Sequence, residues 1–207
     1  MKLSLNAFWL KIIALVSMTI DHIGYFGFPG NIYWRIVGRL SFVIFAYMIA
    51  NGYLYTRNKV RHGLIILGLG LLFDLALIVT NNYSASNIFT TLGLGYFLIM
   101  FYDNKKYGLC SLILLSSLFF PLDYGIYGLL FILFSYIFYN NISKLLFANV
   151  MLVIFGLYFG MVMDIQIFSC LGIILLYCYN HEKGRGLKYF FYIYYPAHII
   201  ILRLIFS

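Results

Sequence analysis

The chain has 207 residues, of which 64% are hydrophobic and only 10% are charged, with a formal net charge of +8. Soluble domains carry roughly a quarter of charged residues, so this composition excludes a soluble enzyme, a disordered chain and a disulfide scaffold. A membrane-spanning helix needs about 20 apolar residues. The length therefore predicts one integral membrane domain over residues 1–207, of the all-α class: a polytopic transmembrane helical bundle.

Nine apolar runs follow one another along the chain, separated by short polar breaks. The first contains Lys11 and continues through Asp21-His22, unlike the uncharged core and small-residue cleavage site of a signal peptide. The fifth run is short, so we expect about nine spans, within a range of eight to ten. The predicted spans cover residues 8–28, 33–55, 63–80, 86–102, 109–121, 124–140, 145–161, 164–180 and 188–206.

Basic residues are confined to alternate loops, where nine Lys and Arg residues lie on one side and none on the other. The positive-inside rule places the basic loops and the N-terminus in the cytoplasm. We therefore expect a multi-pass membrane protein whose partners include membrane lipid but no nucleic acid. The high usage of Lys, Asn, Ile and Tyr indicates an AT-rich bacterium, so the expected location is the bacterial plasma membrane. The basic loops lie near residues 56–62, 103–106, 140–144 and 181–188.

Ionisable residues inside the apolar runs are the candidate functional groups. Four of them, unpaired at the centre of a span, would together cost about 12 kcal/mol, so they must pair or face water. A purely structural role is hardest to accept for Asp21-His22, because imidazole is the natural general base near neutral pH. Adjacent helical residues point about 100° apart, so Asp21 is expected to pair with Arg39, and another group must set the His22 tautomer. The four charged residues are Asp21, Arg35, Arg39 and Asp74.

Simpler interpretations remain for several of these groups. Arg35 lies near the predicted outer interface and can extend its cation to water. Arg39 can belong to a structural ion pair, and His198, at mid-depth of the last span, can be a structural histidine. The buried Asp, His and Arg residues also suit a small-solute or proton-coupled transporter, although we see no inverted repeat in the sequence. A nonenzymatic assembly factor is a third alternative. No ligand spacing indicates a metal site.

Several short motifs follow one another in order along the chain. They include Thr19-Ile20-Asp21-His22-Ile23-Gly24, Arg35-Ile36-Val37-Gly38-Arg39, Phe73-Asp74, Asn87-Ile88-Phe89-Thr90 and Tyr195-Pro196 with His198. This ordered set resembles the TraX family, which is named for a conjugation-plasmid protein that acetylates the N-terminus of pilin. More distantly, the chain is similar to the YeiB-like and heparan-glucosaminide-type transmembrane acyltransferases. It departs from the family pattern at Val43, where a proline is expected, and at Asn51, where an acidic residue is common.

The resemblance implies an enzyme that moves acetyl from cytoplasmic acetyl-CoA to a hydroxyl or amine outside the membrane. The acceptor expected is a protein N-terminus, a peptide or a cell-surface glycan. His22 would be the general base or a transient acyl carrier, Arg39 would stabilise the thioester oxygen, and Asp21 and Asp74 would hold the arginines, with His198 as a second acid/base group. Expected to bind the cofactor are Arg35, Arg57, Lys59, Arg61, Lys183, Arg185 and Lys188.

Overall fold

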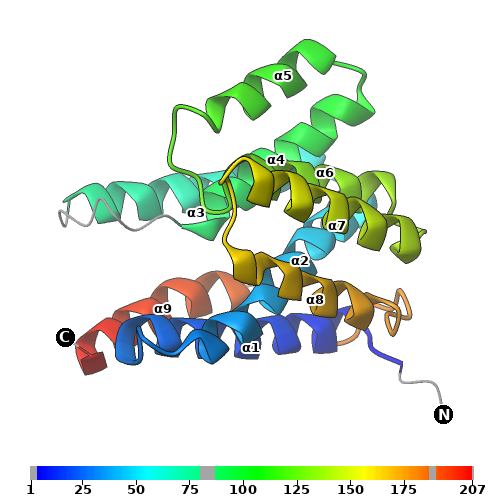
Figure 1. Cartoon of the computed structure of the whole chain (residues 1–207). Helices are drawn as coiled ribbons and strands as arrows, with labels where there is room; N and C mark the ends of the chain where they lie inside the picture. The colour runs from blue at the N-terminus through cyan, green and yellow to red at the C-terminus, as the bar shows by residue number, and fades with distance from the viewer. Residues whose placement is uncertain (1–3, 80–86, 187–189, 207) are drawn as a thin grey trace.

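A computed structural model describes residues 4–79, 87–186 and 190–206. Nine α-helices and one 3-10 helix, η1, lie in these ranges (Figure 1), and the only strand-like pairing among them is one isolated bridge between Leu5 and Tyr179. The elements are α1 (Ala7–Gly27), α2 (Ile32–Tyr55), α3 (Lys59–Val79), α4 (Ile88–Asp103), α5 (Tyr107–Ser116), α6 (Gly125–Ile137), α7 (Ile142–Tyr158), η1 (Asp164–Phe168), α8 (Ser169–Leu176) and α9 (Phe190–Phe206).

The all-α class is confirmed, and each predicted apolar run overlaps one of the α-helices. Among the described residues, α1, α2 and α3 are long and apolar enough to cross a membrane, with 21, 24 and 21 residues. The other helices are also apolar but shorter, and α5 has only 10 residues, as the short fifth run indicates. The total of about nine spans stays a prediction.

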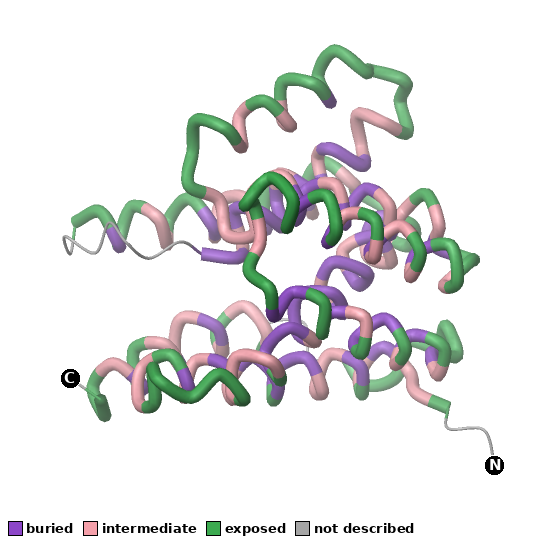
Figure 2. The backbone as a smooth tube through the Cα atoms, viewed as in Figure 1, coloured by how far each residue is buried: buried purple, intermediate pink, exposed green. Residues whose placement is uncertain are grey.

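The core is built around α2, which packs against α1, α6 and α8. Burial is concentrated on α2 and its neighbours, whereas α5 is largely exposed (Figure 2). The central segment of α2, from Phe42 to Tyr47, is almost completely buried, except for Phe45. The outer face of α3 instead exposes leucines such as Leu71 and Leu72. Large apolar faces of this kind mark contact with membrane or protein, and they fit a helical bundle surrounded by lipid.

The polar loops that hold most basic residues meet at one end of the bundle. Leu5 N–H donates to the carbonyl of Cys178 at 2.7 Å, which joins the N-terminal segment to the loop before α9. Asp103 at the end of α4 accepts from the Tyr53 hydroxyl of α2 at 2.6 Å. We call this the basic-loop end. The C-terminus lies at the opposite end (Figure 1).

Helices α1 and α2 approach each other closely, and glycines permit it. A Cβ atom on Gly38 of α2 would overlap the carboxylate of Asp21 on α1. The Ser17 hydroxyl of α1 donates to the Val37 carbonyl of α2 at 2.5 Å. Small residues let helix backbones approach in lipid. Because Gly38 has no side chain, the Asp21 carboxylate also fits between the two helices.

Candidate functional site

Two cavities lie along the bundle and share one wall residue, Tyr195. The arginine cavity has a volume of about 370 Å³ and is lined by ionisable side chains of α1 and α2, together with Arg203 of α9. The basic-loop cavity has a volume of about 310 Å³, largely apolar walls, and three cations: Lys11, Lys183 and Arg185. Tyr195 is 5% exposed and contributes to the walls of both the polar cavity and the largely apolar one.

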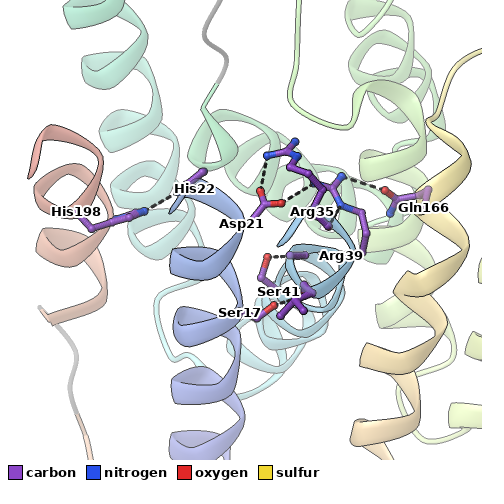
Figure 3. A network of polar contacts seen from close by, with 10 residues as sticks. Ser17, Asp21, His22, Arg35, Arg39, Ser41, Gln166 and His198 are labelled. Carbon is purple, nitrogen blue, oxygen red and sulfur yellow. Dashed lines mark hydrogen bonds and ion pairs between the residues drawn. The ribbon is translucent and has the colours of Figure 1, made fainter. Parts of the chain in front are cut away.

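Asp21 is the centre of an ion cluster with two arginines (Figure 3). Arg35 Nη1 donates to Asp21 Oδ2 at 2.9 Å, and Arg39 Nη2 donates to Asp21 Oδ1 at 3.3 Å. The two arginines are four residues apart, so they project from one face of α2. The pairing of Asp21 with Arg39 predicted from the sequence is confirmed. One carboxylate and two guanidinium groups leave the cluster with a net positive charge.

A buried hydrogen-bond chain holds Arg39 from the other side. Arg39 Nη1 donates to Gln166 Oε1 at 3.4 Å, and Gln166 Nε2 donates to the Tyr127 hydroxyl at 3.1 Å. Asp123, in the loop before α6, lines the same cavity. Burial raises the pKa of the Asp123 carboxyl to about 6, although the nearby Arg39 cation favours its ionised form. The guanidinium of Arg39 is thus fixed by partners from three helices: α1, η1 and α2 itself, whose Arg35 carbonyl accepts from Nε at 3.1 Å.

His22 and His198 form a directed pair. His22 Nδ1 lies 2.7 Å from His198 Nε2, and His198 Nδ1 lies 2.9 Å from the carbonyl oxygen of Tyr194. A carbonyl only accepts, so in neutral His198 the hydrogen is on Nδ1 and Nε2 is an acceptor. His22 must then donate from Nδ1, which leaves its Nε2 with a free lone pair. His198 is therefore the group that sets the His22 tautomer, which the sequence required but did not identify.

One stripe of α1 connects the two cavities. Lys11, Leu15 and Met18 line the basic-loop cavity, and His22 on the same helix lines the arginine cavity. Their spacing of three and four residues puts them on one helix face. At 1.5 Å per residue, the stripe runs about 16 Å from Lys11 to His22. The Lys11 ammonium stands over the Phe191 ring at 5.5 Å.

Comparison with known proteins gives the family. The model of the family described as TraX protein matches residues 7–206. This chain belongs to the TraX family. It is 25% identical to the probable fimbrial assembly protein FimC, serogroup H1, of Dichelobacter nodosus, over 95% of this chain and 94% of that protein. The uncharacterized protein RP591 of Rickettsia prowazekii is 31% identical over 46% of this chain and 37% of its own length. No solved structure matches.

The structure brings four of the five predicted catalytic residues of this TraX protein together. Asp21, His22 and Arg39 line the arginine cavity, and His198 contacts His22. Asp74 differs, because its carboxylate accepts from Asn87 Nδ2 and from the Thr90 hydroxyl at 2.5 Å. Within the described residues, Asp21 is the carboxylate that holds the two arginines, and Asp74 instead joins α3 to the start of α4.

The predicted cofactor residues separate into three groups. Lys183 and Arg185 line the basic-loop cavity, whereas Arg35 lies in the arginine cavity, paired to Asp21. Lys59 Nζ pairs with Asp103 Oδ2 at 3.4 Å, and neither it nor the two arginines beside it lines either cavity in the part of the chain described. Lys188 lies outside the described residues. The arginines beside Lys59 are Arg57 and Arg61.

Some cavity residues with polar or charged groups lie outside the predicted site: Lys11, Asp123, Gln166, Tyr195 and Arg203. Lys11 and Arg203 are cations inside apolar helices, and this is a signal that the sequence offers. Tyr195 belongs to a motif of the family resemblance, but no role was predicted for it. For Asp123, in a loop, and Gln166, in η1, the linear sequence does not tell whether the side chain faces a cavity.

Proposed function

We propose that this TraX-family protein is an integral membrane acetyltransferase. It would take acetyl from cytoplasmic acetyl-CoA and transfer it to a hydroxyl or amine acceptor on the outer side of the membrane. The observation that carries the proposal is the position of His22, which keeps a free lone pair on Nε2 and lines a cavity that shares the wall residue Tyr195 with a second, cation-lined cavity.

The basic-loop cavity suits the donor. Lys11, Lys183 and Arg185 offer cations to phosphate groups, and the apolar walls accommodate the slender pantetheine arm. The α1 stripe of about 16 Å leads from these cations toward His22. Acetyl-CoA supplies the acetyl group already activated as a thioester. The positive-inside rule puts this cavity on the cytoplasmic side, where acetyl-CoA is found.

The arginine cavity suits the transfer step. His22 Nε2 takes the proton from the acceptor hydroxyl or amine as its oxygen or nitrogen bonds to the thioester carbonyl carbon. The negative charge that develops on the carbonyl oxygen faces Arg39 and Arg35, each of which has N–H donors that its hydrogen bonds within the cluster do not use. When the carbon–sulfur bond breaks, His22 returns its proton to the departing thiolate. All atoms balance without a metal or a redox partner.

The first acceptor class to test is a protein N-terminus, because the Dichelobacter nodosus relative is named a fimbrial assembly protein. Secreted peptides and cell-surface glycans follow as alternatives. The protein would work as a multi-pass component of the bacterial plasma membrane, with the basic-loop end in the cytoplasm and the arginine cavity toward the outside.

Binding of acetyl-CoA to purified protein in nanodiscs tests the proposal. A ligand at 100 times its dissociation constant stabilises a protein by about 2.7 kcal/mol, which a thermal melt detects, and ADP at matched ionic strength controls for phosphate binding alone. Replacing both Lys183 and Arg185 by Gln should remove the stabilisation. Lys144→Gln, which removes one cation outside the lining of both cavities, should retain it.

Catalysis is tested separately by release of free CoA thiol from acetyl-CoA in membranes that contain acceptor. His22→Ala should abolish the release and keep acetyl-CoA binding. If acetyl-CoA at millimolar concentration shifts no melting curve, the protein has no acyl donor. The two cavities on either side of Tyr195 would then be better explained as a transport path.

A further inference from the structure

Arg203 is a cation that the transfer step does not use. It lies in the last turn of α9 and lines the arginine cavity. No carboxylate of the described residues lies within ion-pair distance of it, in contrast to Arg35 and Arg39, which share Asp21. Its guanidinium stands over the Phe26 ring at 5.8 Å, and the Phe26 ring lies 6.4 Å from the ring of His22. One aromatic ring therefore separates this free cation from the proposed base.

The distribution of cations makes this position unusual. Of the Lys and Arg residues that the structure describes, all but three lie at the basic-loop end or line the basic-loop cavity. The remaining three, Arg35, Arg39 and Arg203, all line the arginine cavity. Cations near the outer surface of a membrane protein run against the positive-inside bias. Gathering all three in one cavity concentrates positive charge where a ligand can enter.

The carboxylates of the cavity do not neutralise this charge. Asp21 is shared by two arginines, and Asp123 is the only other carboxylate among the described lining residues. Three guanidinium groups thus face at most two negative charges. A guanidinium group binds carboxylate and phosphate through two parallel N–H donors, and it does so better than an ammonium group.

Resting on the acetyltransferase function proposed above, we propose that the acceptor carries an oxyanion, a carboxylate or a phosphate, and that Arg203 binds this group while the nucleophile faces His22. Neutral polyols and peptides without an acidic group would then be poor acceptors. In this arrangement Arg203 selects and orients the acceptor, and takes no part in the proton transfer or in binding the acyl donor.

Two pairs of small probes test this inference on purified protein in nanodiscs. Glycerol 1-phosphate is compared with glycerol, and the C-terminally amidated dipeptide Gly-Glu-NH2, whose side chain is its one carboxylate, with Gly-Gln-NH2, by thermal shift across a concentration series. We expect the phosphate probe, the carboxylate probe or both to stabilise the wild type, while the partners without an oxyanion do not. The phosphate response identifies a polyol-phosphate acceptor, and the dipeptide response identifies an acidic peptide.

Arg203→Gln should weaken the anionic probe by about tenfold or more, as expected for loss of a hydrogen bond to a charged group, and Arg203→Lys should recover part of it. Lys144→Gln is the charge-matched control and should bind as the wild type does. Three outcomes would overturn the inference. The probes with and without an oxyanion bind equally, neither kind binds, or the response to the anionic probe is unchanged in Arg203→Gln. Acetyl-CoA binding, measured in the same variants, reports on the donor site independently and stays unchanged in Arg203→Gln.

Discussion

Removing His198 separates its role as a positioning residue from a role as the base. The hydrogen bonds of 2.7 Å to His22 and 2.9 Å to the Tyr194 carbonyl assign it the task of holding the proton on His22 Nδ1. A net hydrogen bond of this kind contributes about 1 kcal/mol. His198→Leu should therefore lower the rate of acetyl transfer by roughly fivefold to tenfold, since 1.4 kcal/mol corresponds to about a factor of ten. Loss of a general base costs about 10²- to 10⁴-fold, which is the effect expected for His22→Ala.

The assay is release of CoA thiol from acetyl-CoA under conditions that saturate the donor, with protein abundance and acetyl-CoA binding measured alongside. Tyr194→Phe is the matched control, because it removes the phenol oxygen but keeps the carbonyl that orients His198. It should retain most of the activity. If His198→Leu loses as much activity as His22→Ala, His198 is itself the proton acceptor. If Tyr194→Phe is equally inactive, the effect comes from packing of α9 against α1 and the tautomer argument is refuted.

Three further changes test the surroundings of the site. Asp21→Asn leaves two guanidinium groups without a carboxylate and should lower the free energy of unfolding by about 3–5 kcal/mol, measured by denaturation in mixed micelles; an unchanged stability would contradict the ion cluster. Gly38→Ala pushes a methyl group into Asp21 and should destabilise by about 1–3 kcal/mol, whereas Gly30→Ala, with open space around it, should not. Tyr195→Ala joins the two cavities and should let butyryl-CoA serve as a donor, which Tyr195→Phe should not do; equal use of butyryl-CoA by the wild type would refute a partition at this residue.

Asp123 gives a pH-dependent prediction. Its folded-state pKa of about 6 lies above the unfolded value near 3.9, so the folded protein binds the proton more tightly. Stability from this group is then greatest below about pH 4 and is lost as pH rises through 6. Asp123→Asn should raise the melting temperature relative to the wild type at pH 8, with little difference at pH 4. Parallel curves for the two proteins across this range would exclude the buried carboxyl.

The sequence predicted the helices well because long apolar runs with polar breaks have few alternatives to helices in lipid. Spacing of four residues placed Arg35 and Arg39 on one face of α2, and the costs of burial required a partner for them. The sequence favoured Asp21 as the partner of Arg39 and left Asp74 as a second carboxylate that could hold the arginines. The choice depends on the rotation of α3 about its axis, which brings Asp74 to Asn87 and Thr90 instead.

Other parts of the site depend on tertiary contacts that a linear pattern does not encode. The loop containing Arg57 and that containing Arg185 look alike as basic loops, yet Arg185 lines a cavity and Arg57 does not. The partner of His22 is 176 residues away in the chain. The direction of its proton follows from the carbonyl of Tyr194, one helical turn before His198, which accepts from His198 Nδ1.

Separate replacement of the two arginines in the ion cluster distinguishes a structural ion pair from a functional site. One arginine is enough to neutralise Asp21, and Arg39, whose side chain is 7% exposed, is the more buried partner. Arg35 is 26% exposed and adds a second, uncompensated cation. Arg35→Gln should therefore cost less than about 1 kcal/mol of stability, as expected for a partly solvated pair. Arg39→Gln should cost more, because it removes a buried guanidinium group that donates to Asp21, Gln166 and the Arg35 carbonyl.

The rate of acetyl transfer in Arg35→Gln then distinguishes a functional role of Arg35 from a structural one. If Arg35 stabilises the thioester oxygen, Arg35→Gln loses about 10²-fold or more in rate in a protein that melts almost as the wild type does. If the cluster is only structural, activity follows stability, and Arg35→Gln remains nearly fully active.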